Sequence, residues 1–153
     1  MSSIPDEVAS HSFLEGMTPA QAERVMALAT REVFEAGDHM MHVGDPEPGA
    51  YLILSGLVAL QVNSPARGPV LVETLLPNET VGWSWLVYPH RSTFDVVALE
   101  TTVAYHLDSR GTRALCEEDH DLGFLVARRL LGVVSQRLAA TRFRLLDLYA
   151  DVY

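Results

Sequence analysis

Two side chains that often carry out catalysis, lysine and cysteine, are absent or nearly absent from this sequence, and the others are not grouped as known reactions require. The 153 residues contain no lysine, which excludes a phosphate-binding lysine of the Walker type and a lysine that forms a Schiff base. Residues 82–86 read GWSWL, which lacks the second glycine of a nucleophile elbow. We therefore expect this chain not to be an enzyme.

Residue types that bind metals are equally dispersed. Cys116 is the single cysteine, so an intramolecular disulfide is excluded, and we interpret this residue as a small packed hydrophobe. His39 and His42 flank two methionines, and an offset of three in a strand would place the two rings on opposite faces. Two ligands without a third do not make a metal site. We predict no metal and no cofactor other than a possible cyclic nucleotide ligand.

Charge is distributed unevenly along the chain, which has a net charge of −9. Residues 1–109 carry four arginines against 14 acidic residues, whereas residues 122–146 carry five arginines and no acidic residue. Because affinity for nucleic acid comes mostly from neutralised phosphates, the acidic body argues against direct DNA binding. The basic segment has two interpretations, which are pairing with the acidic body and a surface for a partner or ligand.

Targeting signals are missing from the sequence. No apolar run approaches the ~18 residues of a membrane helix. The N-terminus has neither the basic start nor the apolar stretch of a secretory signal. We expect a cytoplasmic protein with no membrane partner.

The elements that would position any site follow from turn and cap residues. Phe13 and Leu14 are expected to anchor a loose N-terminal segment. Thr18 and Gln21 occupy the positions of a capping box around Pro19, which predicts a helix. From about residue 31 the pattern changes to short β-type runs between glycine and proline turns, typical of a sandwich or barrel. Strands are expected at 51–54, 57–62, 70–76 and 94–107.

Two helices are expected after the strands. Asp108 or Ser109 can cap a short helix that ends at Glu118, and a long helix is expected from about Asp121 to Leu148. The expected division of the chain is an N-terminal segment at 1–16, a body at 17–118 and a long C-terminal helix at 119–153.

The long helix has a heptad pattern of about four repeats, which favours a helix–helix interface. Val126, Leu130 and Val133 form a second apolar stripe that would pack on the helix's own domain. Two apolar faces predict a homodimer, whereas a single wide buried face is the alternative. The expected dimer seam consists of Phe124, Leu131, Val134, Leu138, Thr141 and Leu145, with Val152 continuing the spacing.

Arginines complicate a parallel pairing of two such helices. In that register Arg137 would face Arg142 of the partner helix, and like charges destabilise the pair. Either the arginines turn to acidic residues of the body, or the helices do not keep this register throughout.

The first β segments carry a resemblance to a known family. Residues 34–45 read FEAGDHMMHVGD and residues 49–58 read GAYLILSGLV, with glycines at the turns. This pattern resembles the cyclic nucleotide-binding domain of the catabolite activator protein (Crp/Fnr-like) family over residues 12–150. The resemblance implies a mainly β fold with flanking α-helices, namely an antiparallel double-stranded β-roll of jelly-roll type, and a long C-terminal helix that dimerises. Activators of that family continue into a helix-turn-helix domain, whereas this chain ends at Tyr153, which implies a stand-alone regulatory domain.

The resemblance also points to a site. In that family a phosphate-binding cassette begins with Gly-Glu, whose Glu binds ribose, and ends with Arg-Ser or Arg-Thr, whose Arg binds the phosphate. In residues 81–96 Gly82 matches, Trp83 replaces the Glu, and Arg91-Ser92 resembles the final pair. A gap-free alignment of the following strand instead places Ser92 at the arginine position. The resemblance implies ligand-binding roles for Gly82, Trp83, Ser84, Arg91 and Ser92, and pocket-wall roles for Trp85 and Phe94.

The departures from the cassette leave three interpretations open. Loss of the Glu removes a hydrogen bond to a charged group, about 1.5–3 kcal/mol or one to two decades of affinity. The pocket could bind cyclic AMP, bind a different anionic or nucleotide ligand, or be filled by its own side chains. We expect a dimeric regulatory sensor whose ligand need not be cyclic AMP. The alternative is a ligand-free adaptor that recruits a protein through the basic helix or the tryptophan loop.

Overall fold

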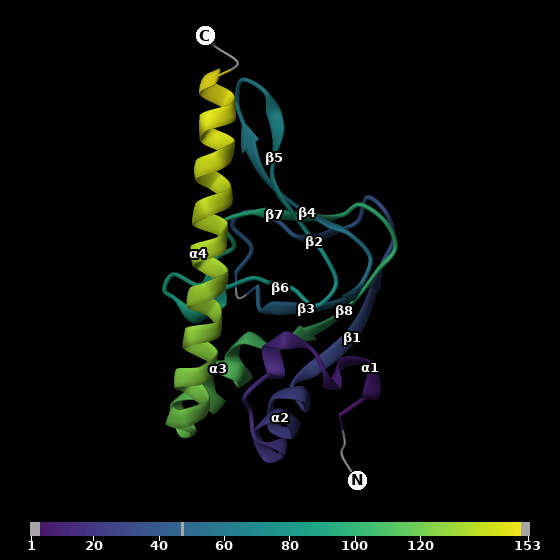
Figure 1. The fold of residues 1–153 in the computed structure, drawn as a ribbon, viewed down its shortest axis with the longest axis vertical. Coiled ribbons are helices and arrows are strands. Elements are labelled where there is room, and N and C mark those ends of the chain that lie inside the picture. The colour runs from purple at the N-terminus through teal and green to yellow at the C-terminus, as the bar shows by residue number, and fades with distance from the viewer. Residues whose placement is uncertain (1–3, 47, 151–153) are drawn as a thin grey trace.

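Two antiparallel sheets form a roll beside one long helix (Figure 1). The computed structural model describes residues 4–46 and 48–150, so the last expected seam residue, Val152, lies outside the described part. One sheet has the strand order β1-β8-β3-β6 and the other has the order β2-β7-β4-β5. The predicted mainly β roll with flanking helices is therefore confirmed. The strands are β1 (Ala29–Phe34), β2 (His39–Met41), β3 (Ala50–Ser55), β4 (Val58–Ser64), β5 (Gly68–Leu75), β6 (Thr80–Val81), β7 (Asp95–Ala98) and β8 (Thr102–Leu107).

The expected strand at 94–107 is in fact two strands in different sheets. β7 pairs with β2 and β4, whereas β8 pairs with β1 and β3. At the crossing, Thr102 is fully buried and its hydroxyl donates to the Glu100 carbonyl at 2.9 Å. No glycine or proline marks this bend, so the prediction of one continuous strand was wrong.

Alternation along β3 builds two adjoining cores. Ala50 and Leu52 face a cluster shared with the helices, whereas Tyr51 and Ile53 face a cluster between the two sheets. Successive side chains of a strand point to opposite faces, so one strand serves both cores. The roll interior and the helical layer are consequently coupled through β3.

Residues 6–14 are largely helical, contrary to the expected loose segment. They form α1 (Asp6–Ala9) and the 3₁₀ helix η1 (Ser12–Leu14), and Phe13 and Leu14 are buried as expected. The predicted capping box is confirmed at α2 (Pro19–Met26), where Thr18 and Gln21 satisfy each other's backbone N–H groups.

The long helix α4 (His120–Ala150) follows α3 (Ser109–Glu118), and Figure 1 shows it running along one side of the roll as far as β5. Asp108 caps α3 through the Gly111 N–H, as predicted. Val126 and Leu130 on α4 are buried in the helical core, so the predicted second stripe packs on its own domain. No helix in the described part of the chain has the length and apolar character of a membrane crossing.

Candidate functional site

The expected cassette lies between β6 and β7 and begins at a glycine that no other residue could replace without strain. Gly82 has φ +97°, and a Cβ there would lie 2.5 Å from the Gly49 carbonyl oxygen. Gly82 thus permits a close approach to the chain's own backbone. The 3₁₀ helix η2 (Ser84–Leu86) follows, and an irregular loop leads on to β7.

A small cavity lies where the resemblance places the ligand. Its volume is about 20 Å³, room for about one water molecule. Sites for drug-sized ligands have volumes of about 300–1,000 Å³. The lining side chains thus leave far less room at this position than such a ligand occupies. The lining residues are Met41, Leu60, Val81, Gly82, Trp83, Ser84, Ser92, Thr93, Phe94, Val96 and Arg137.

The expected wall residues take different positions. Trp83 and Phe94 are half-buried and both line the cavity. Trp85 does not line it, because its ring is fully buried in the helical core with residues of α4. There its indole N–H donates to the Gly82 carbonyl at 3.2 Å, and Arg113 donates to its backbone carbonyl at 2.6 Å. Trp85 therefore couples the cassette to the helices.

The Arg91-Ser92 pair is split by the fold. Arg91 is exposed, and its Nη1 donates to the Gly44 carbonyl at 2.9 Å, away from the cavity. Ser92 is buried and lines the cavity, and its hydroxyl donates to the Phe94 carbonyl at 2.8 Å. The placement of Ser92 agrees with the gap-free alignment, and the anion-binding role of Arg91 stays a prediction.

Sequence reasoning missed the cation that does reach the cavity, which is Arg137 of α4. Its side chain is 6% exposed, Nη1 donates to Glu73 of β5 at 3.0 Å, and Nη2 donates to the Thr80 carbonyl at 3.1 Å. Burial lowers the pKa of Arg137 from its ordinary value, although the nearby carboxylates of Glu73 and Glu79 oppose this shift. The sequence did hold one sign of this contact, namely the like-charge pairing expected between Arg137 and Arg142 of a partner helix. Arg137 avoids that pairing because its side chain turns to an acidic residue of the body, Glu73.

The expected seam residues lie on the part of α4 that the roll leaves uncovered. Phe124, Leu131 and Leu138 are 60–68% exposed, and Leu145 is 52% exposed. Val134 is half-buried, and the exposed Thr141 donates its hydroxyl to the Arg137 carbonyl at 2.8 Å. Four large apolar side chains of the expected seam are therefore exposed along α4.

Other reactive side chains do not gather. The rings of His39 and His42 stack at 4.4 Å, contrary to the expected opposite faces, because β2 ends at Met41. The described residues contain no group of three or more His, Cys, Asp or Glu side chains that could hold a metal ion. Burial raises the pKa of the half-buried Cys116 thiol, which disfavours a reactive thiolate.

Comparisons with known proteins agree with this architecture. A putative cyclic nucleotide-binding protein from Geobacter metallireducens superposes with a TM-score of 0.78 at 21% identity, covering 90% of this chain and 99% of that one. The catabolite activator protein of Thermus thermophilus gives 0.68 at 24% identity over 90% of this chain and 62% of that one. A regulatory subunit of a cAMP-independent protein kinase A from Trypanosoma brucei gives 0.71 at 21% identity over 92% and 48%.

Sequence comparison identifies a family but no relative among the curated proteins. A search of curated proteins found no match. Residues 31–119, more than half of the chain, match the cyclic nucleotide-binding domain family. This chain therefore belongs to the cyclic nucleotide-binding domain family.

Proposed function

We propose that this protein is a non-catalytic regulatory domain whose nucleotide site is closed to cyclic nucleotides and whose output surface is helix α4. The observation that carries the proposal is the small size of the cavity, about 20 Å³, between Trp83 and Phe94 of the cassette and Arg137 of α4, which line it. Trp83 also stands where the family's ribose-binding Glu is expected. The protein kinase A regulatory subunit with the same fold is described as cAMP-independent, so this fold does not require that ligand.

Calorimetric titration with cyclic AMP and cyclic GMP tests this proposal. Wild-type protein is expected to give no binding heat at millimolar ligand, because neither the space nor the ribose contact is available. Trp83→Glu combined with Phe94→Ala, which restores the carboxylate and removes a ring, is expected to gain affinity. Micromolar binding by the wild type that is lost in Arg91→Ala would contradict closure and restore the cyclic nucleotide sensor.

A second candidate function is sensing of a different anionic ligand at the same site. It is favoured by the polar groups that face the cavity, since Ser84, Ser92 and Arg137 are all buried there. Such a ligand would have to displace Glu73 from Arg137, and it would thereby loosen α4. Thermal-shift measurements with mononucleotides, dinucleotides and inorganic phosphate test this function. A rise in melting temperature that Arg137→Met abolishes would favour it, and no shift would exclude these ligands.

We also propose that α4 pairs two copies of the chain. Burying the exposed seam of Phe124, Leu131, Leu138 and Leu145 would remove four large apolar side chains from water, each contributing roughly 1.5–3 kcal/mol when fully buried. Sedimentation velocity is expected to show a dimer that Leu131→Glu with Leu138→Glu dissociates. Leu99→Glu, at a leucine exposed on the roll, is the matched control. A monomeric wild type at micromolar concentration would contradict the pairing.

A further inference from the structure

Helix α4 presents a third face, distinct from its buried stripe and from its proposed dimer seam. Leu125, Gly132, Ala139 and Leu146 recur every seven residues and each follows a seam residue. One residue turns by about 100° around an α-helix, so this face is turned away from the seam. Two hollows lie along it.

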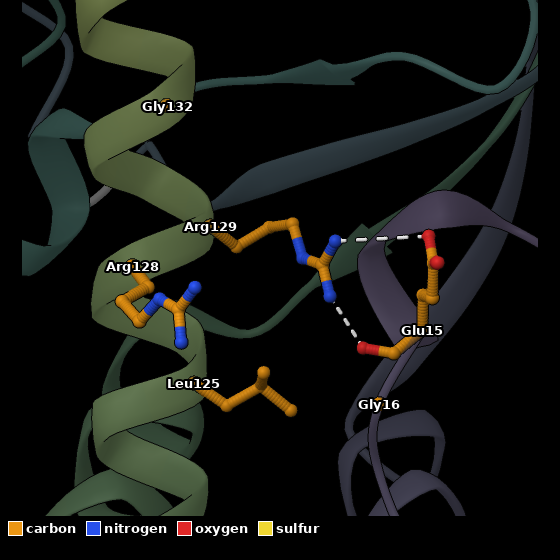
Figure 2. Close-up of a pocket in the computed structure, with 6 residues that line it drawn as sticks. All are labelled: Glu15, Gly16, Leu125, Arg128, Arg129 and Gly132. Carbon is orange, nitrogen blue, oxygen red and sulfur yellow. Dashed lines mark hydrogen bonds and ion pairs between the residues drawn. The ribbon is translucent and has the colours of Figure 1, made fainter.

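The first hollow lies between α4 and the turn that precedes α2, and Figure 2 shows the residues that line it. Its volume is about 430 Å³. Gly132 leaves its floor open, because a Cβ there would meet nothing within 4 Å. Arg128 and Arg129 of α4 both line the hollow, and Figure 2 shows the Arg129 guanidinium reaching across to Glu15.

The positive charge of this hollow is only partly balanced. Arg129 donates from Nη2 to the Glu15 backbone carbonyl, and its Nη1 is 3.9 Å from the carboxylate of Glu15, which is itself 78% exposed. The Nε of Arg129 is buried without a hydrogen-bond partner. Arg128 lies over the Phe124 ring at 5.7 Å, and no carboxylate in the described part of the chain forms an ion pair with it. A second carboxylate would find unused donors here.

The second hollow is apolar and lies further along α4. Ala139, Phe143, Leu146 and Arg142 line its volume of about 210 Å³, and Phe143 and Leu146 are 71% and 64% exposed. Arg142 also forms no ion pair with a described carboxylate. From Gly132 to Ala139 the helix rises about 10 Å, so the cationic and apolar hollows lie about two turns apart.

We infer that this face, lined by Leu125, Arg128, Gly132, Arg142 and Phe143, binds an acidic amphipathic helix of another protein. A carboxylate of that helix would pair with Arg128 and Arg129, and an apolar side chain two turns away would enter the second hollow. Charge complementarity supports this occupant, since neither Arg128 nor Arg142 forms an ion pair with a carboxylate among the described residues. The apolar lining of the second hollow favours a protein, which can supply an apolar side chain, over a phosphate polymer. The inference rests on the proposed output role of α4 but not on the state of the nucleotide cavity.

Binding of designed peptides tests the inference. Two helical peptides, each three heptads long, share the same leucines and carry either glutamates or lysines one heptad from a leucine. Fluorescence anisotropy is expected to show that the full chain binds the glutamate peptide, with affinity that falls at least tenfold when Arg128→Glu and Arg142→Glu are combined and that also falls with added salt. Arg67→Glu, an exposed arginine on the β4–β5 turn, is the matched control and is expected to change affinity less than twofold.

Each other outcome overturns the acidic partner. Equal affinity for the lysine peptide, no binding of the glutamate peptide, or binding that ignores the charge reversals would each refute it. Binding of anionic vesicles in preference to the glutamate peptide would assign the face to a membrane instead. Arg128 and Arg142 flank the proposed seam, so sedimentation of the Arg128→Glu, Arg142→Glu protein is measured beside the peptide titration. Peptide affinity that falls while sedimentation stays at the wild-type value supports the inference, and affinity that falls only together with loss of the dimer refutes it. The cyclic nucleotide titration remains a separate result.

Discussion

Replacing Glu73 by Gln is expected to destabilise the protein more than removing its partner, Arg137. The Arg137 side chain is 6% exposed and that of Glu73 is 16% exposed, so loss of the carboxylate leaves the more deeply buried charge unpaired. Breaking a buried pair in this way costs about 3–5 kcal/mol. We expect about 3 kcal/mol for Glu73→Gln, because the Thr80 carbonyl still accepts from Nη2.

The reverse change leaves a carboxylate that has other support. In Arg137→Met, Gln136 still donates to Glu73 at 2.8 Å and water is nearer, so we expect a cost of about 1–2 kcal/mol. Combining Glu73→Leu with Arg137→Met removes both charges, and the free energy of unfolding is expected to return to within about 1 kcal/mol of wild type.

Equilibrium urea unfolding at neutral pH measures these differences. All variants are compared at one protein concentration, because a dimer makes apparent stability depend on concentration. The reasoning is refuted if Glu73→Gln lies within about 0.5 kcal/mol of wild type, the usual range of surface substitutions. A larger loss in the free energy of unfolding for Arg137→Met than for Glu73→Gln would refute it as well. Burial of the unpaired charge would then not determine how much stability is lost.

Three further predictions concern local structure. Gly82→Ala is expected to cost about 1–3 kcal/mol in urea unfolding, because of its positive φ and the contact with the Gly49 carbonyl. Thr18→Ala is expected to lower the free energy of unfolding by about 1 kcal/mol, since it removes half of the capping box with Gln21. A loss below about 0.5 kcal/mol would contradict this capping role. Burial lowers the pKa of His11 below the unfolded value near 6.5, so the unfolded chain binds more protons and the free energy of unfolding falls as the pH drops through about 6.5. His11→Asn is expected to reduce the dependence of the free energy of unfolding on pH between about pH 7.5 and 5.5. An unchanged pH dependence would assign it to other groups.

Local signals predicted the helical ends of this chain well. The capping box at Thr18 and the cap at Asp108 depend on residues three positions apart, which a sequence displays directly. The heptad and inner stripes of α4 also follow from spacing, and Val126 and Leu130 are buried accordingly. Glycine-marked turns placed most strands of the roll within a few residues.

The candidate site was less predictable because its contacts are distant in sequence. Arg137 reaches Glu73, which lies 64 positions earlier, and no local pattern specifies that partner. The bend between β7 and β8 has no turn residue, and it depends on pairing with four other strands. Trp85 illustrates the same limit, because a tryptophan in a loop suits a pocket wall or a core equally well, and only the packing of α4 decides between them.

The most direct test of the closed site is a crystal structure of the protein grown with millimolar cyclic AMP. We predict that the space between Ser92, Phe94 and Arg137 will hold no nucleotide, and that the Arg137–Glu73 distance will stay near 3.0 Å. A nucleotide bound between Gly82 and Ser92, with Arg137 withdrawn from Glu73, would contradict closure and would show that α4 opens to a cyclic nucleotide.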